Sequence, residues 1–347
     1  MATKSRKSLY VFSFVIALLI AGAGLWLYAL IYRSNVELGG RRSEFFYIRS
    51  NWSYPDVVNS LVEHKFIKDR HSFEWVARLK KYDKGIKPGR YRLLENMSNS
   101  ALVNMLRRGD QEPVHFTLNA VRTKEQLASR VGGKLEADST VLLSMLNDNV
   151  YLTRLGMNSN TILTLFIPNT YEFYWTSSAQ DFMDRMAKEY KKFWNEERRA
   201  KARVVGLTQT EVVILASIVQ EEQTRYEEER PIIAGLYLNR LKEHMPLQSD
   251  PTVRFALGDF TVNRILSEDL RIESPYNTYL HYGLPPGPIC FPEPSSIDAV
   301  LTPKKSRYLY MCAEFGTGKH NFAETFEQHR INAQRYREEL DKNGIKR

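Results

Sequence analysis

The sequence predicts an α+β protein with a single N-terminal transmembrane helix, a small α+β module and a larger, mixed, helix-rich domain. Three observations lead to this prediction. One run of 24 residues, 9–32, is apolar and uncharged, short strand and helix patterns follow it to about residue 118, and longer helical patterns fill the rest of the 347 residues. The hydrophobic content of 43% excludes a disordered chain. The length suits two domains of roughly 150 residues each.

The apolar run is long enough to cross a membrane. As a helix it would extend roughly 36 Å, at about 1.5 Å per residue, against a hydrocarbon core of about 30 Å. A cleaved signal peptide has a shorter apolar segment, of roughly 7–15 residues. We therefore expect residues 9–32 to be an uncleaved signal anchor behind a short tail, residues 1–8, with Trp26, Tyr28 and Tyr32 near the far interface.

The orientation of the anchor is predicted from charge and size. Basic residues stand on both sides of the apolar run, so the positive-inside rule does not decide the orientation. They are Lys4, Arg6 and Lys7 before the run and Arg33, Arg41 and Arg42 after it. A very short basic tail ahead of a large domain favours a cytoplasmic tail and a domain outside the cytoplasm.

Residues 33–118 form the predicted small module. Ser53 and Pro55 are typical of a helix start, since serine caps free N–H groups and proline suits the first turn. The expected elements are a strand at 45–48, a helix from Ser53, a helix at 72–81, a strand at 90–94, a helix from Ser100 to Leu106 and a strand at 114–118. A strand, helix, helix, strand order of this size resembles carbohydrate-binding LysM modules.

Residues 119–347 form the predicted larger domain. Helical patterns occur near 123–132, 138–147, 178–198, 209–226, 230–243 and 322–342. Between 246 and 320 we expect Pro-, Gly- and aromatic-rich loops with short strands such as 308–311. The formal net charge is +9, but the densest basic run, 188–203, is interrupted by Glu196 and Glu197. A solvated helix explains that run better than a nucleic-acid site, and no nucleic-acid partner is predicted.

The most informative helix begins at Thr208. Thr208 and Glu211 form a capping box, and the following residues, 212–219, are apolar on all sides, which predicts a buried helix. Glu222 continues the apolar stripe of Leu215 and Ile218. A carboxyl against apolar neighbours has a raised pKa and can serve as a general acid near neutral pH. The alternative, that the helix surfaces here and its glutamates are solvated, stays open at this point.

Other residue patterns indicate a polar, aromatic ligand rather than a metal or nucleotide. The loops around Gln248 and Asp250 and around Tyr276 and Asn277 offer the amides, hydroxyls and rings that a sugar polymer requires. Residues 316–319 (GTGK) lack the first glycine and the Ser or Thr of a phosphate loop. The histidines have no metal-site spacing, so we expect no metal and no cofactor. Cys290 and Cys312 could form at most one disulfide.

Seven ordered blocks resemble the YceG-like endolytic murein transglycosylases. They are 166–171 (FIPNTY), 215–222 (LASIVQEE), 239–241 (NRL), 247–253 (LQSDPTV), 276–279 (YNTY), 283–289 (GLPPGPI) and 318–322 (GKHNF). The second glutamate of the family motif is the catalytic acid/base, and it corresponds to Glu222. The first motif glutamate is Gln220 here, a departure that would shift the pH optimum if that carboxylate tunes the second.

The resemblance implies a reaction, a place in the cell and partners. The reaction cleaves the β-1,4 bond between N-acetylmuramic acid and N-acetylglucosamine within peptidoglycan strands and leaves 1,6-anhydro ends. The enzyme would sit in the bacterial cytoplasmic membrane with its catalytic domain in the periplasm, where it would terminate nascent strands beside peptidoglycan synthases.

The resemblance also assigns roles to further residues. Gln248, Asp250, Tyr276 and Asn277 would line the glycan cleft. Ser217 and Asn239 would orient the helix that carries Glu222. An Asp250 that faces Glu222 across the cleft would favour hydrolysis, which uses two carboxylates. The other alternative is a non-catalytic, membrane-anchored peptidoglycan-binding scaffold.

Overall fold

The computed structural model describes residues 2–261 and 265–343, with side chains from residue 9 onward. The side chains of the predicted tail, 1–8, and residues 344–347 of the predicted larger domain lie outside the described residues. The chain divides into two compact units. The N-terminal unit comprises 1–115, 134–136 and 172–178, and the C-terminal unit comprises 116–133, 137–171 and 179–347.

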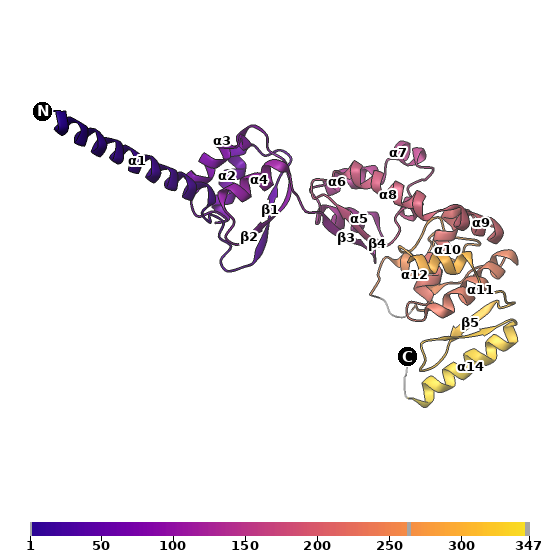
Figure 1. Ribbon diagram of the computed structural model, residues 1–347. Coiled ribbons are helices and arrows are strands. Elements are labelled where there is room, and N and C mark those ends of the chain that lie inside the picture. Colours follow the sequence, from indigo (N-terminus) through magenta and orange to yellow (C-terminus); the bar gives the residue numbers. More distant parts are fainter. Residues whose placement is uncertain (1, 262–264, 344–347) are drawn as a thin grey trace. The chain divides into compact units, whose positions relative to one another are not determined.

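The N-terminal helix α1 spans Ala2–Tyr32 (Figure 1). Its segment Leu9–Tyr32 has a mean hydropathy of 2.4 and is long and apolar enough to cross a membrane, and none of it is buried within the protein over its most apolar window. The end of α1 is different, because Leu30 and Ile31 pack against the core of the module. The Asn99 side-chain amide also donates to the Leu30 carbonyl at 3.1 Å, which attaches the helix to the module.

The module follows the predicted strand, helix, helix, strand order. Strands β1 (Ser43–Ile48) and β2 (Gly89–Leu94) form an antiparallel pair, and helices α2 (Tyr54–Glu63), α3 (Arg70–Leu79) and α4 (Asn99–Arg108) pack on a common core with the short helix η1 (Tyr82–Lys84). The Ser53 capping box opens α2, as predicted. The predicted start of α4 at Ser100 is wrong, because Ser98 is the cap and accepts a hydrogen bond from the Ala101 N–H.

Strand β3 (Val114–Leu118) forms where a strand was predicted, but it does not join β1 and β2. Its partner is β4 (Asn169–Phe173), about 50 residues later in the chain. A strand pattern reports local burial and alternation, whereas the choice of partner depends on contacts that are distant in sequence.

The C-terminal unit is mainly helical (Figure 1). Its elements after β3 are α5 (Lys124–Gly132), α6 (Ser139–Met145), α7 (Asn149–Arg154), η2 (Ile162–Leu165), β4, α8 (Ala179–Phe193), α9 (Glu196–Val205), α10 (Gln209–Glu222), η3 (Glu227–Glu229), α11 (Arg230–Lys242), α12 (Asp250–Leu257), η4 (Asp269–Arg271), α13 (Pro294–Leu301), β5 (Tyr310–Ala313), β6 (His320–Ala323) and α14 (Phe326–Lys342). Strands β5 and β6 are antiparallel.

Three sequence predictions for this unit need correction. The helix predicted at 178–198 is two helices, because Trp194 is fully buried at the break and the Asn195 side chain caps α9. The region predicted as loops from 246 to 320 contains helices α12 and α13, each with a proline in its first turn. The helix predicted from 322 starts at Phe326, since residues 320–323 form β6.

Helix α10 is the centre of the C-terminal core. All eight residues of its body, 212–219, are buried, as the apolar sequence predicted, and the capping box of Thr208 and Glu211 is present. Helices α11 and α13 pack against α10. The last residue of this buried helix is Glu222, so the core positions that carboxyl.

Candidate active site

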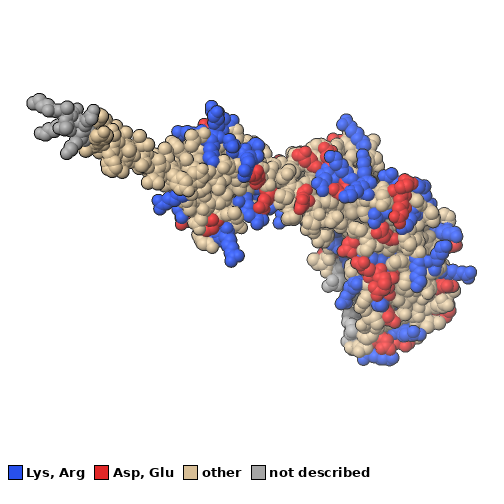
Figure 2. Space-filling model, viewed as in Figure 1, with Lys and Arg blue, Asp and Glu red and all other residues tan. Residues whose placement is uncertain are grey.

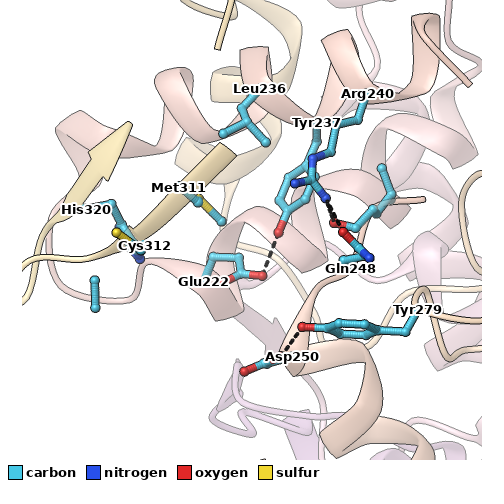
Figure 3. A pocket seen from close by; sticks show the side chains of 12 residues that line it. Glu222, Leu236, Tyr237, Arg240, Gln248, Asp250, Tyr279, Met311, Cys312 and His320 are labelled. Atoms are coloured by element: carbon cyan, nitrogen blue, oxygen red, sulfur yellow. Dashed lines mark hydrogen bonds between the residues drawn. The ribbon is translucent and has the colours of Figure 1, made fainter. Parts of the chain in front are cut away.

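A pocket of about 230 Å³ opens at the C-terminal end of α10 (Figure 3). Side chains from α10, α11, α12, β5, β6 and the loops between them line it. They are Glu222, Leu236, Tyr237, Arg240, Leu247, Gln248, Asp250, Tyr279, Met311, Cys312, Ala313 and His320. The structure therefore brings together three of the residues singled out from sequence, namely Glu222, Gln248 and Asp250.

Two hydroxyl groups hold the Glu222 carboxyl. Tyr237 donates to Oε1 at 2.6 Å (Figure 3), and Ser249 donates to the same oxygen at 2.5 Å. In the part of the chain that the structure describes, Oε2 forms no hydrogen bond. One carboxyl oxygen is therefore fixed by the protein, and the other is available to a substrate.

Burial raises the pKa of Glu222, and the nearby Asp250 carboxylate adds to this effect. The hydrogen bonds from Ser249 and Tyr237 act in the opposite direction, since they stabilise the ionised form, but burial outweighs them. The residue surface is half-buried because part of it faces the pocket, while protein surrounds most of the carboxyl. A carboxyl in this environment holds a proton at higher pH than an exposed glutamate.

The residues next to Glu222 have other partners. Glu221 forms an ion pair with Arg122, with both carboxylate oxygens within 3.1 Å of Nη2. The Gln220 Oε1 atom accepts from the Glu293 N–H and the Ser296 hydroxyl at the first turn of α13. Neither side chain lines the pocket, so Glu222 is the member of this run placed for chemistry.

A second carboxylate, Asp250, shares the pocket at the start of α12. Tyr279 donates to its Oδ1 at 2.6 Å (Figure 3). Beside it, Gln248 is exposed with a φ of 52°, and Arg240 Nη1 lies 3.3 Å from its Oε1. Arg240 is itself buried and also donates to the Leu247 and Leu309 carbonyls. This side of the pocket offers a carboxylate, an amide and two phenols.

The opposite wall contains a histidine held by a buried carboxylate. Nδ1 of His320 lies 2.9 Å from Oε2 of Glu229, and the His320 N–H donates to the other oxygen at 3.1 Å. Gln223, which follows Glu222, donates to the same Glu229 oxygen at 2.7 Å. No hydrogen bond to Nε2 of His320 is formed within the described ranges. The ring is thus fixed at one nitrogen, and it lines the pocket.

Two residues predicted to contact glycan do not line this pocket. Asn277 is fully buried, and its amide donates to the Leu270 and Ile272 carbonyls, so the side chain supports a loop. Tyr276 packs on Phe255 with ring centroids 4.7 Å apart. Their Tyr-Asn-Thr-Tyr block reaches the pocket through Tyr279.

The two predicted supporting residues tie segments to the helices. Ser217 on α10 is fully buried, donates to the Ile214 carbonyl and accepts from the Ile289 N–H at 3.0 Å. Asn239 on α11 donates to the Ser306 and Tyr308 carbonyls.

The cysteines and possible metal ligands complete the site. Cys290 and Cys312 are both free thiols, and burial raises the pKa of each. Among the residues that the structure describes, no group of three His, Cys, Asp or Glu side chains is placed to hold a metal ion.

Sequence reasoning missed four residues of the site: Tyr237, Ser249, Glu229 and His320. Ser249 lies between two residues that were selected, and His320 lies in one of the seven blocks, so both had a local signal. Tyr237 and Glu229 had none, because only the packing of α11 and η3 brings them to the pocket.

Comparisons with known proteins place the chain among named relatives. The YceG-like family model matches residues 46–335. A Bacillus subtilis protein named endolytic murein transglycosylase is 28% identical over 335 residues, covering 92% of this chain and 91% of that protein. A Streptococcus pneumoniae protein of the same name is 27% identical over 359 residues, covering 94% of this chain and 64% of that protein. A crystal structure of a YceG-like protein from Listeria monocytogenes matches with a TM-score of 0.55 and 28% identity, covering 84% of this chain and 99% of that one.

Proposed function

Because the chain belongs to the YceG-like family, we propose that it is an endolytic murein transglycosylase, the name given to its relatives from B. subtilis and S. pneumoniae. Its substrate is the glycan strand of peptidoglycan. It cleaves the β-1,4 bond between N-acetylmuramic acid and N-acetylglucosamine within the strand and leaves a 1,6-anhydromuramyl end. The observation that carries this proposal is the Glu222 carboxyl, which is buried, fixed at Oε1 and free at Oε2.

Glu222 acts first as an acid and then as a base. Its Oε2 proton passes to the glycosidic oxygen as the bond from that oxygen to C1 breaks. The C6 hydroxyl oxygen of the same muramic acid then bonds to C1, and its proton returns to the Glu222 carboxylate. The attack is intramolecular and gains from proximity, so one carboxylate suffices. Tyr237 and Ser249 stabilise the carboxylate between the two steps.

The polar walls of the pocket bind the sugar. Gln248 and Asp250 lie on the side of α12, and we place the glycan hydroxyls and amides against them. His320 lies on the opposite side, where Glu229 fixes Nδ1 and leaves Nε2 for a sugar hydroxyl. Tyr276, Asn277, Ser217 and Asn239 act indirectly, by holding the loops and helices that carry these groups.

The N-terminal unit attaches the enzyme to the membrane and to its substrate. Helix α1 anchors the chain in the bacterial cytoplasmic membrane, with the catalytic unit on the periplasmic side. The strand, helix, helix, strand module is LysM-like and binds glycan. An anchored endolytic enzyme of this kind can terminate strands as the peptidoglycan synthases make them.

The direct test is Glu222→Gln, which keeps the size of the side chain and removes its proton. We expect a loss of glycan cleavage of at least about a hundredfold, the lower range for general acid catalysis. Glu221→Gln is the matched control, since that carboxylate faces Arg122, and it should keep most of the activity. Near-normal release of anhydromuropeptides by a folded Glu222→Gln protein would contradict the assignment.

Asp250 favours one alternative reaction, hydrolysis with two carboxylates. In that case Asp250→Asn would abolish cleavage as completely as Glu222→Gln, and the wild-type products would carry reducing ends. A non-catalytic scaffold would instead bind peptidoglycan and release no new ends of either kind.

A further inference from the structure

We infer that the N-terminal unit binds the headgroup of an anionic phospholipid in a pocket where α1 meets the module. The pocket has a volume of about 450 Å³ and is lined by the end of α1 and the first turns of α3 and α4. This inference rests on the anchoring proposed above and goes beyond it, since an anchor helix alone requires no particular lipid.

One wall of the pocket is apolar and belongs to α1. Trp26, Ala29 and Leu30 line it, and Trp26 has 62% of its surface exposed. These residues lie in the last two turns of the apolar segment, where tryptophan typically marks the boundary between hydrocarbon and headgroups. An acyl chain lying along α1 would therefore bring its headgroup to this pocket.

The other walls carry positive charge. Arg33 follows α1 and is exposed, and its guanidinium makes no hydrogen bond or ion pair with any residue that the structure describes. Lys68 lies across the pocket, with Nζ 3.6 Å from a Glu37 carboxylate that is 57% exposed. Such an exposed pair is weak, so Lys68 remains available to a phosphate.

Two helix starts add to this attraction. The first turns of α3 and α4 border the pocket, and free N–H groups at helix starts favour anions. Asp69 is the opposing carboxylate on the wall, but it is the N-cap of α3, and its side chain accepts from the His71 N–H. The cations and helix starts therefore outweigh the single acid on the lining.

Buried amides hold the pocket together. The Asn99 amide donates to the Leu30 carbonyl and to the Ser72 hydroxyl, and its Oδ1 accepts from the Asn35 amide at 2.7 Å. Asn35 and Asn99 are each at most 4% exposed. Because these bonds join α1, α3 and α4, the apolar wall and the cations keep a fixed spacing.

The distribution of charge along the chain supports an anionic partner at this end. Residues 33–115 contain 16 lysines and arginines against 10 aspartates and glutamates, whereas residues 116–347 contain 30 of each. Beyond the tail, the net charge of the protein therefore belongs to the part that contains the pocket. On the face shown in Figure 2, blue side chains outnumber red ones over this module. Anionic lipid surfaces attract such basic segments next to a membrane helix.

The test measures lipid retention by the full chain in detergent, by native mass spectrometry. The probes are phosphatidylglycerol, phosphatidylcholine and inorganic phosphate. We expect phosphatidylglycerol to bind more tightly than phosphatidylcholine and inorganic phosphate not to compete, because it lacks the acyl chain that lies on Trp26 and Leu30. Arg33→Gln with Lys68→Gln should weaken phosphatidylglycerol binding about thirtyfold, the loss expected from two membrane-proximal cations.

The matched control is Arg49→Gln with Lys84→Gln, which makes the same charge change on exposed residues outside the pocket. This variant should retain phosphatidylglycerol like the wild type. Equal losses in both double variants would mean that only overall charge matters and would overturn the site. Equal binding of the two lipids, or displacement of lipid by inorganic phosphate, would also overturn it.

The anchoring itself is read separately. The full chain should stay with the membrane pellet after a wash at high pH. Release by that wash would contradict the anchoring, whereas a retained chain without a headgroup preference would contradict the lipid site alone.

Discussion

At the scale of single residues, the site depends on how the protein treats one carboxyl. The stripe of Leu215, Ile218 and Glu222 is local in sequence, so it could predict the buried position and the raised pKa. It could not predict Tyr237 and Ser249, which lie 15 and 27 residues further along the chain. The apolar stripe alone would suggest a glutamate among hydrocarbon groups, whereas the structure shows one oxygen bonded twice and the other free.

The hydroxyl of Tyr237 should set the pH range of the enzyme. Its hydrogen bond stabilises the ionised form, so Tyr237→Phe raises the pKa of Glu222 further. Activity requires the protonated form and is lost as pH rises through that pKa. The alkaline limb of the kcat profile should therefore move to higher pH, while Tyr276→Phe, outside the pocket, should leave it in place. A limb that stays fixed or moves to lower pH in Tyr237→Phe would contradict this account of Glu222.

The same carboxyl should make stability depend on pH. A glutamate whose pKa is raised by folding contributes stability below its unfolded pKa, about 4.3, and loses it as pH rises through the folded pKa. Glu222→Gln lacks this loss. Its thermal unfolding temperature should therefore exceed that of the wild type by an amount that grows from acidic to neutral pH. Parallel melting curves at every pH would show that the carboxyl is not destabilised by burial.

At the scale of elements, α10 is the platform of the site, and its end distributes three side chains to three partners. Gln220 meets α13, Glu221 meets Arg122 and Glu222 enters the pocket. Sequence could predict α10 because its capping box and apolar body are contained in one segment. Helices α12 and α13 were missed because each has only eight residues and depends on tertiary contacts, such as the Gln220 bonds to the first turn of α13.

The position of Gln220 makes a prediction about the departure from the family motif. Glu at this position would accept the same bonds from α13 and face the positive end of that helix. We therefore expect Gln220→Glu to change stability by only about 0.3–1 kcal/mol, in the stabilising direction, and to leave the pH optimum unchanged. Activity profiles and chemical unfolding of the two proteins check this. A clear shift of the optimum would show that the first motif position tunes Glu222.

At the scale of the whole molecule, sequence could predict the parts better than the partners. The apolar segment, the order of elements in the module and the buried α10 are local signals, and all three are present. The pairing of β3 with β4 and the burial of Asn277 depend on contacts distant in sequence, and the amino-acid pattern did not reveal them. The net charge of +9 becomes informative only when it is divided between the parts of the chain.

The central claim is a one-carboxylate cleavage that ends in an anhydro sugar, and the most direct measurement is mass spectrometry of the ends released from purified glycan strands. We predict 1,6-anhydromuramyl ends from the wild-type protein, about a hundredfold fewer from Glu222→Gln, and the same anhydro product from any activity left in Asp250→Asn. Reducing ends as the main product, with both variants equally inactive, would contradict the account and establish a two-carboxylate hydrolase.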